Sequence, residues 1–296
     1  MNIKAIIHGK SVLKGRLSRE IINAAEKHAL PYQIWETTAK GDAAILAEKA
    51  DSDTLLVSCG GDGTNNEIVN ALMKKQADYR PVFSFLPAGS GNDFCRTTGH
   101  RTAEEMIDRF AKNAISFTDV LQLSAEKEEC FALNMSTMGI GAEIAKTVNK
   151  RKFKLPPELN YYTAILYWLG VYRSPELQIE MNEHVYKSAC LMLAIGNGKY
   201  AGNGLGLCPQ AELNDGLFGG TIFGKVGIRD FLRYQKRLQR CEVIKDDRLH
   251  YLSANEANIS VVKGKLPIET DGEFFTTLQQ GQSLKVKLIS AALRII

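Results

Sequence analysis

The strongest constraint on the fold of this chain is a glycine-rich turn between a buried strand and a helix. The apolar run Thr54–Val57 is typical of a buried strand, and it leads into the segment Gly60–Gly63. Apolar residues then recur at helical spacing from Ile68 to Met73. Thr64 followed by Glu67 is a capping-box pattern, which predicts that the helix begins here. The sequence therefore has three glycines where a strand turns into a helix.

Such a turn is suited to binding phosphate. Glycine lets backbone N–H groups approach an anion closely, and the N-terminus of a helix adds partial positive charge. Asp62 is unusual here, because a lone carboxylate repels phosphate. We expect it to handle a metal ion, a ribose hydroxyl or a charge network. Because Asp-Gly is also common in ordinary turns, this motif alone does not decide the function.

Length and composition indicate a folded protein of two domains. A chain of 296 residues can bury a substantial core. Its 45% hydrophobic and 24% charged residues are ordinary for a globular protein, and a net charge of +4 gives no reason to expect nucleic acid as a partner. The six cysteines are scattered, without a CxxC or Cys/His cluster. We therefore expect reduced thiols, with neither disulfides nor a zinc site.

No membrane-spanning or secretory segment is predicted. The apolar run Ala5–Ile7 is too short for a signal peptide. The longest apolar stretch, Tyr161–Tyr172, is too short to cross a bilayer. We therefore expect a cytoplasmic protein whose membrane contact is peripheral, at the inner face of the membrane and transient.

The first part of the chain alternates strand-like and helix-like segments, which favours a parallel α/β sheet. Ligands of such sheets bind at the carboxyl ends of the strands. The expected strands are Ile3–Ile7, Tyr32–Trp35, Thr54–Val57 and Val82–Leu86. The expected helices are Arg19–Ala29, Asp42–Ala50, the segment after Thr64, and Ala103–Lys112.

After about Val120 the pattern changes to strands joined mostly by turns, which predicts a mostly β second domain. Two helical segments interrupt it, Glu158–Tyr172 and Ile228–Arg240. The expected strands are Phe131–Met138, Leu177–Met181, Val185–Ile195, Phe218–Phe223, Leu249–Leu252, Asn258–Val262 and Leu284–Ile289.

A second glycine-rich loop, Gly89–Phe94, follows the strand Val82–Leu86. It offers glycine backbone, a hydroxyl, an amide and a carboxylate, and by itself it fits an ordinary turn. Two such loops after successive strands are much more specific. Together, GGDGTxNE and G-[ST]-x-NDF resemble the catalytic domain of diacylglycerol kinases, and the resemblance extends to bacterial lipid kinases and to sphingosine and ceramide kinases. Three further segments resemble family motifs in the same order, namely Tyr200–Gly204, Cys208–Leu217 and Ile268–Glu273.

The resemblance covers nearly the whole chain and implies both a fold and an activity. The fold would be a Rossmann-like α/β nucleotide domain beside a β-sandwich-like domain, with the active site in the cleft between them. We expect the ATP-binding domain at residues 1–121, with 287–296 returning to it, and the β-rich lipid-substrate domain at 122–286. Members of the family use ATP and Mg²⁺ to phosphorylate the hydroxyl of diacylglycerol or a related lipid, giving a phospholipid such as phosphatidic acid.

The resemblance also implies contacts to ATP. Thr37 matches a nucleotide-contacting threonine, and Thr38 is the alternative if the register shifts. Ser90 stands where family members often have threonine, so the hydroxyl is retained. His8 replaces the asparagine of a related first loop, which leaves contact of that loop with ATP open. The phosphate cradle would consist of Gly60, Gly61, Asp62, Gly63, Thr64, Asn65 and Asn66.

Phosphoryl transfer depends mainly on positioning and charge neutralisation. The resemblance makes Asp62, Asp93 and Asp119 the catalytic carboxylates of a water–Mg²⁺ network around the phosphates. Glu273 matches the general base of the family, which accepts the proton of the lipid hydroxyl. Asp271-Gly272 also fits a plain hairpin turn, and that turn would aim Glu273 into the cleft.

A second Mg²⁺, structural rather than catalytic, is implied near the Asp215 loop. Its ligands would be the carboxylate of Asp215 and the backbone carbonyls of Glu212 and Leu217. Without the resemblance, this loop is a turn before the strand Phe218–Phe223.

Two basic segments suit an anionic membrane surface, although either also fits a solvated face over core packing. The first contains Lys146, Lys150, Arg151, Lys152 and Lys154. The second has one helical face formed by Arg229, Arg233, Lys236, Arg237 and Arg240. The stretch Tyr161–Tyr172 fits either a pocket for acyl chains or a buried helix.

Two other functions stay open at this stage. NAD kinases and phosphofructokinases share GGDGT, so a kinase of a soluble substrate is possible, and the NDF and DGE segments argue against it. A regulator that senses nucleotide or lipid without turnover is the non-enzymatic alternative. The retained Asp62, Asp93, Asp215 and Glu273 argue against that alternative. An antiparallel β domain also has edges that can pair, so a homodimer is possible.

Overall fold

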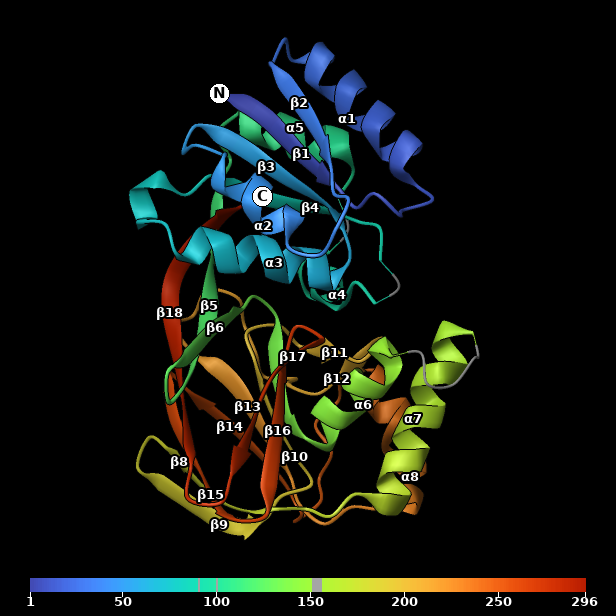
Figure 1. Cartoon of the computed structure of the whole chain (residues 1–296), viewed down its shortest axis with the longest axis vertical. Coiled ribbons are helices and arrows are strands. Elements are labelled where there is room, and N and C mark those ends of the chain that lie inside the picture. The colour runs from blue at the N-terminus through green and yellow to red at the C-terminus, as the bar shows by residue number, and fades with distance from the viewer. Residues whose placement is uncertain (90, 100, 151–155) are drawn as a thin grey trace.

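Figure 1 shows two parts, an upper α/β layer built from the first third of the chain and a lower β-rich part flanked by helices on one side. The structure is a computed structural model that describes residues 1–89, 91–99, 101–150 and 156–296. The elements of the upper part are β1 (Asn2–Ile7), α1 (Lys14–Lys27), β2 (Tyr32–Glu36), α2 (Asp42–Glu48), β3 (Thr54–Gly60), α3 (Asp62–Met73), the 3-10 helix η1 (Ala77–Tyr79), β4 (Val82–Pro87), α4 (Asp93–Thr98) and α5 (Ala103–Ala111).

The upper part contains the predicted parallel sheet, with strand order β2–β1–β3–β4. Every residue of β3 is buried, as expected for a strand covered on both faces. Leu55 and Val57 pack with α1 and α5, whereas Leu56 between them packs with α2 and α3. Because β3 and β4 are parallel neighbours, their carboxyl ends bring the two glycine loops to one edge of the sheet.

The lower part is a sandwich of two sheets, as the β-rich prediction required. A six-stranded antiparallel sheet has the order β14–β13–β10–β7–β16–β17. The elements of this part are β5 (Ser116–Ala125), β6 (Glu128–Ala132), β7 (Met135–Gly139), α6 (Ile140–Asn149), α7 (Pro157–Val171), β8 (Glu176–Met181), β9 (His184–Ala189), β10 (Met192–Gly196), β11 (Tyr200–Ala201), β12 (Leu205–Gly206), β13 (Phe218–Phe223), α8 (Ile228–Gln239), β14 (Leu249–Ala254), β15 (Glu256–Lys263), β16 (Lys265–Thr270), β17 (Glu273–Gln279) and β18 (Ser283–Ile295).

The six-stranded sheet is covered on both faces. Leu193 and Phe218 pack into the sandwich core against residues such as Leu123 and Val286 of the larger sheet. Ala194, the neighbour of Leu193, packs instead with α6, α7 and α8. The alternation of side chains along a strand therefore separates the sandwich core from a second core under these three helices.

The long strand β18 connects the two parts. It pairs antiparallel with β15 and β5, and its last residues run parallel to β4 through Ile295 and Phe83. Arg80 donates a 2.7 Å hydrogen bond from Nη1 to the carbonyl of Ala292. The upper and lower parts thus share one ten-stranded sheet, whereas the sequence predicted only that residues 287–296 return to the first domain.

The predicted start of α3 was wrong. The helix begins at Asp62 with Gly61 as its N-cap, and no side chain caps it. Thr64 lies inside the helix, with its side chain against Gly60, and Glu67 accepts a hydrogen bond from the Gly41 N–H at 3.0 Å. The capping-box pattern failed because Thr64 lies within the helix against Gly60, while Glu67 binds the loop before α2.

Two predictions of single strands were also wrong. The segment 131–138 is divided between β6, in the ten-stranded sheet, and β7, in the six-stranded sheet. The segment 185–195 is likewise divided between β9 and β10. Both runs are continuously β-like because the chain passes directly from one sheet of the sandwich to the other. The helix α6, which follows β7 without a loop, was missed.

Candidate active site

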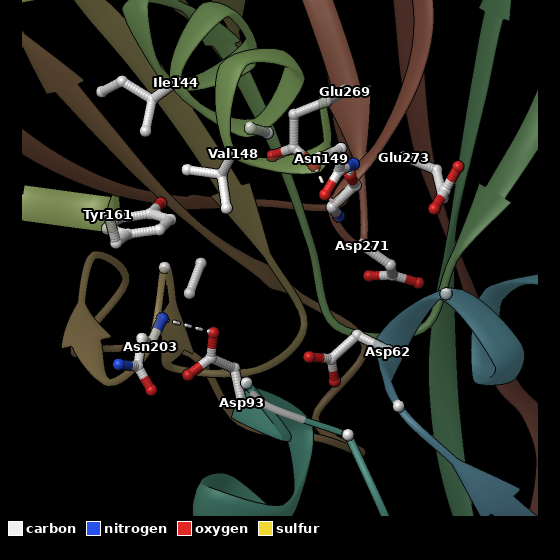
Figure 2. A pocket seen from close by; sticks show the side chains of 18 of the residues that line it. Asp62, Asp93, Ile144, Val148, Asn149, Tyr161, Asn203, Glu269, Asp271 and Glu273 are labelled. Atoms are coloured by element: carbon white, nitrogen blue, oxygen red, sulfur yellow. Dashed lines mark hydrogen bonds between the residues drawn. The ribbon is translucent and has the colours of Figure 1, made fainter. Parts of the chain in front are cut away.

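A cavity of about 1260 Å³ lies between the two parts. The glycine loops after β3 and β4 form its upper wall, and the turn between β16 and β17 faces them. In Figure 2, Asp62 and Asp93 of this upper wall lie at the bottom of the view, and Asp271 and Glu273 lie above them on the opposite side of the cavity. The cavity therefore lies in the cleft where the sequence predicted an active site.

The two glycine loops form one surface because their backbones touch. A Cβ atom added to Gly89 would lie 2.4 Å from the Cα of Gly61, so only glycine fits there. A Cβ atom on Gly91 would lie 2.7 Å from Oδ2 of Asp62. Side chains at these positions would separate the loops. Ser90, the predicted ATP contact between these glycines, lies outside the described residues.

Asp62 is the carboxylate with the most perturbed environment on the upper wall. Burial, and then the negative charges of Asp93 and Asp271, raise the pKa of Asp62 to about 7. Backbone N–H groups of Asn92 and Asp93 oppose this shift only in part. A positive charge beside Asp62 would relieve the repulsion, so this carboxylate fits a bound cation.

Asp93, on the same wall, binds the backbone of a neighbouring glycine-rich loop. Its carboxylate accepts hydrogen bonds from the backbone N–H groups of Asn203 at 2.9 Å and Gly204 at 2.7 Å. Burial raises the pKa of Asp93 above its ordinary value, while these hydrogen bonds oppose the shift. The glycine-rich stretch Tyr200–Gly204 is thereby fixed against the second glycine loop, as Figure 2 shows for Asn203.

The described residues do not form a complete metal site by themselves. They contain no group of three or more histidine, cysteine or acidic side chains arranged to hold an ion. Mg²⁺ commonly takes one or two carboxylates and completes its shell with water and substrate phosphates. Asp62 and Asp93 suit that mode of binding, in which the nucleotide supplies the remaining oxygens.

Glu273 lies at the start of β17 on the lower wall, and its side chain reaches across the cleft to α3. Its Oε1 atom lies 3.1 Å from the position that a Cβ atom on Gly63 would occupy. Its Oε2 atom lies 2.7 Å from Nζ of Lys40. The structure therefore brings the predicted base next to the N-terminus of α3, although these segments are far apart in the sequence.

The predicted ATP contacts are only partly on the cavity wall. Thr37, Thr38, Gly61, Asp62, Gly63 and Thr64 line it, as does His8. Thr37 accepts a hydrogen bond at Oγ1 from the Gly9 N–H at 3.2 Å. Gly60, Asn65 and Asn66 are not among the described lining residues. Asn66 instead donates to Asp271 Oδ2 at 3.4 Å and to the carbonyl of Phe131 at 3.3 Å. That residue therefore connects the two walls.

Asp119 is also outside the described lining of the cavity. Its carboxylate accepts hydrogen bonds from Gly216 N–H at 2.9 Å and from Ala291 N–H at 2.7 Å. It thus joins the predicted structural-metal loop to β18. Within that loop, Asp215 accepts a hydrogen bond from the Leu217 N–H at 2.9 Å, and the side chains of Glu212 and Asp215 are exposed. The loop presents oxygen donors of the type Mg²⁺ prefers, and its metal stays a prediction.

Sequence reasoning missed two buried acids on the lower wall. Asp271 accepts hydrogen bonds from the N–H groups of Leu133, Asn134 and Met135 at 2.8 to 3.0 Å. Glu269 accepts from Thr137 N–H at 2.9 Å, and burial raises its pKa to about 7. The alternation of Glu269, Asp271 and Glu273 along one hairpin was the available signal, and only the last had been assigned a role.

The far end of the cavity is apolar. It lies under α6, α7 and α8, and Figure 2 shows Ile144 and Val148 on its wall. Ile165 and Leu169 of α7 contribute, so part of the stretch predicted as an acyl-chain pocket does line the cavity. The other apolar lining residues include Ile140, Leu191, Met192, Leu205, Leu207, Phe223, Val226, Phe231 and Leu238.

A parallel α/β domain with a glycine cradle, facing a β-sandwich across a cleft, defines the fold class shared by diacylglycerol kinases and NAD kinases. The model of the diacylglycerol kinase catalytic domain matches residues 3–123. The model of the YegS C-terminal NAD kinase beta sandwich-like domain matches residues 134–296. The chain therefore belongs to the diacylglycerol kinase family of lipid kinases, and the predicted resemblance and fold class are confirmed.

Curated relatives and solved structures agree with this assignment. A probable lipid kinase YegS-like protein of Enterobacter sp. (strain 638) is 32% identical over 75% of this chain and 74% of its own length. The probable lipid kinase YegS of Shigella flexneri is 28% identical over 98% of this chain and 93% of its own. The structure of a diacylglycerol kinase from Bacillus anthracis superposes with a TM-score of 0.74 and 21% identity, covering 100% of this chain and 96% of that one. Yeast NADH kinase shares the fold at a TM-score of 0.55 and 13% identity, over 100% of this chain and 82% of that one.

Proposed function

We propose that this protein is an ATP- and Mg²⁺-dependent kinase of the hydroxyl of diacylglycerol or a related membrane lipid. The product would be a phospholipid such as phosphatidic acid. The observation that carries the proposal is a single cavity with two chemistries, a glycine cradle with carboxylates at one end and an apolar channel at the other. A phosphoryl donor suits the first end, and an acyl chain suits the second.

In this mechanism, the ATP phosphates bind the backbone of Gly61–Thr64 at the N-terminus of α3, with Thr37 and Ser90 as further contacts. Mg²⁺ held by Asp62, Asp93 and phosphate oxygens would neutralise charge on the transferring group. The lipid hydroxyl attacks the γ-phosphorus in line, its new O–P bond forming as the bond to the ADP oxygen breaks.

Glu273 accepts the proton of the attacking hydroxyl in this scheme. It lies on the lower wall, next to the helix terminus that would hold the phosphates. Asp119 would act through the Asp215 loop, where a second, structural Mg²⁺ would bind with Glu212 and Leu217 carbonyls. We place the ATP-binding domain at 1–121 with 287–296, and the lipid domain at 122–286.

Phosphorylation of a soluble substrate is the competing function, since the fold is shared with a yeast NADH kinase. The apolar channel under α6, α7 and α8 favours the lipid, because a dinucleotide would leave these aliphatic walls without a partner. A non-catalytic sensor is disfavoured by the intact set of acids around the cradle.

A substrate panel tests the proposal directly. Purified protein with radiolabelled ATP and Mg²⁺ should phosphorylate diacylglycerol or another hydroxylated lipid in mixed micelles, and it should leave NAD and glycerol unlabelled. If only a soluble alcohol is labelled, the proposal of a kinase stands and the proposal of a lipid substrate is refuted. Absence of any product, together with tight nucleotide binding, would support the sensor instead.

The variant Val148→Trp separates the two ends of the cavity. Val148 lies on α6 in the apolar channel, and it is partly buried, so a larger ring would fill the channel. We expect turnover of long-chain lipid to fall about 10-fold or more, while ATP binding stays within about 2-fold. An equal loss for long-chain and short-chain lipids would argue that the channel holds no acyl chain.

The surface over this channel suits a membrane. Leu166 of α7 and Leu232 of α8 are 39% and 58% exposed, and Arg229, Arg233 and Lys236 of α8 are exposed as well. No helix among the described residues is long and apolar enough to span a membrane. We propose transient, peripheral binding at the inner face of the cytoplasmic membrane. Arg151, Lys152 and Lys154 of the first basic segment lie outside the described residues.

Replacing Arg229, Arg233 and Lys236 together by Gln should weaken binding to anionic vesicles. Each cation near the surface contributes about 1 kcal/mol, so three should cost about 100-fold in partitioning at low salt. Sedimentation with phosphatidylglycerol vesicles measures it. The matched control replaces Lys14, Arg16 and Lys112, which are exposed on the upper part and already paired with acids. Equal losses in both triple variants, or binding that is insensitive to salt, would contradict the assigned surface.

A further inference from the structure

Among the ion pairs of the described residues, one crosses the cleft. Nζ of Lys40, in the loop between β2 and α2, lies 2.7 Å from Oε2 of Glu273 on β17. Both residues line the cavity. The side chain of Lys40 is 80% exposed and that of Glu273 is 37% exposed. The mechanism proposed above gives Glu273 a task and gives Lys40 none.

The backbone around Lys40 is held firmly. Oδ2 of Asp42 accepts hydrogen bonds from the N–H groups of Thr38 at 2.7 Å and Ala39 at 2.8 Å. On the other side of Lys40, the N–H of Gly41 donates to Glu67 on α3. The loop is thus anchored before and after Lys40. Only the flexible side chain of Lys40 is free to change its partner.

The partner it holds now is easily exchanged. Ion pairs at exposed positions contribute little, because solvent screens them and two long side chains must be ordered. Hydrogen bonding and the charge of Glu273, followed by the charge of Glu67, raise the pKa of Lys40 above its ordinary value, so the amine is charged. A phosphate group at the N-terminus of α3 would carry more negative charge than Glu273. It would also lie next to Glu273, because the carboxylate of Glu273 already approaches Gly63.

We propose that Lys40 is a nucleotide-responsive residue that pairs with Glu273 in the free protein and moves to the terminal phosphate when ATP binds. The move leaves Glu273 unpaired at the moment when the acceptor hydroxyl must lose its proton. Lys40 would therefore couple occupation of the phosphate site to release of the base. This inference rests on the proposed kinase function.

A double-mutant cycle on nucleotide affinity tests the transfer. Calorimetry without lipid would measure binding of ATP and Mg²⁺ to the native protein, Lys40→Ala, Glu273→Gln and the double variant. Lys40→Ala should weaken binding about 10-fold, through loss of a charge-assisted hydrogen bond, and Lys40→Arg should restore most of it. Glu273→Gln should strengthen binding more when Lys40 is present than when it is Ala, because only then does the carboxylate compete with phosphate for the amine.

The opposite sign of coupling would overturn the proposal. If Lys40 keeps Glu273 neutralised while nucleotide is bound, removing Glu273 helps binding more in the Lys40→Ala background. Equal effects in both backgrounds would mean that Lys40 and Glu273 are not coupled in nucleotide binding, which would also contradict the transfer. If the native protein binds no nucleotide at all, the kinase function itself fails, which is a separate outcome.

Chemical labelling gives a second measurement that does not depend on turnover. Acetylation of Lys40 by an amine-reactive ester, followed by mass spectrometry, should be several-fold faster in Glu273→Gln than in the native protein. ATP with Mg²⁺ should protect Lys40 in both proteins. Lys112 is the matched control, since it is 70% exposed and its Nζ lies 2.8 Å from Asp108 outside the cavity. The labelling rate of Lys112 should not change on adding ATP or on replacing Glu273. If the labelling rate of Lys40 is also unchanged when ATP and Mg²⁺ are added, the transfer is contradicted.

Discussion

Glu273→Gln is expected to lower lipid phosphorylation by about 100- to 10,000-fold, the usual contribution of a positioned general base. The amide has the shape of the carboxylate but cannot accept the proton. Nucleotide binding should persist, because the cradle is formed by backbone of Gly61–Thr64 and by carboxylates on the other wall. Single-turnover assays with radiolabelled ATP and diacylglycerol would measure the loss, and calorimetry the retained binding.

The matched control for this variant is Glu256→Gln. Glu256 is a half-exposed acid whose Oε1 lies 2.8 Å from Nζ of Lys285, and it is not among the described lining residues of the cavity. Its replacement should change turnover by less than about 2-fold. Normal turnover by Glu273→Gln would remove the base from the mechanism, and simultaneous loss of nucleotide binding would make Glu273 a structural residue.

Asp62→Asn is expected to have two effects of opposite sign. Activity should fall about 100-fold or more, because a ligand suited to Mg²⁺ is lost from the transferring phosphate. The metal-free protein should become more stable at pH 8, by about 1 to 2 kcal/mol after allowance for the open cavity that the carboxyl faces. The stability gain arises because the Asp62 carboxylate is buried and is also repelled by the negative charges of Asp93 and Asp271.

The pH dependence of that gain follows from the raised pKa of Asp62. An unfolded aspartate titrates near its ordinary value, whereas the pKa of Asp62 in the folded protein is about 7. The folded state therefore binds the proton of Asp62 more tightly than the unfolded state does. The stability that this protonation contributes is fully present below pH 4 and is lost as pH rises from 4 through 7. Asp62→Asn should flatten that part of the curve.

Urea unfolding in EDTA at pH 5, 6, 7 and 8 would measure the effect. Asp108→Asn is the matched control, because a hydrogen bond from Lys112 holds the pKa of the partly exposed Asp108 below its ordinary value. That substitution should not stabilise the protein at any of these pH values. A fall in stability for Asp62→Asn at pH 8 would show that its carboxylate is held by favourable contacts rather than strained by its neighbours.

Much of the upper part was predictable because its signals are local. Strand and helix periods in β1 to β4 and in α2 and α5 placed those elements within a few residues, and the two glycine loops fell at strand ends. Glu273 was assigned by resemblance to a motif, and the hairpin turn before it explains why it reaches the cleft. These features depend on residues that are neighbours in the sequence.

The contacts of several site residues could not be predicted, because they join segments that are distant in the sequence. Asn66 was predicted as part of the cradle, and no local pattern announced that its amide donates to the Phe131 carbonyl and to Asp271 across the cleft. Asp119 was predicted as a carboxylate of the metal network, and no local pattern announced that it also accepts hydrogen bonds from Gly216 and Ala291. Lys40 gave no signal at all, because its partner lies 233 positions away. The sequence shows that these three side chains are polar or charged, but only the tertiary packing shows which groups they contact.

The shared strand β18 has a consequence for the order of events on the ribosome. Ser84 on β4 donates to the carbonyl of Ile296, 212 residues later in the chain. At about 5 to 20 residues per second, the outer edge of β4 would wait about 10 to 40 seconds for its neighbour. An unpaired edge of this kind invites pairing with other chains. The upper part is therefore synthesised long before the strand that completes its sheet, and a chain that ended before β18 would leave β4 with an open edge.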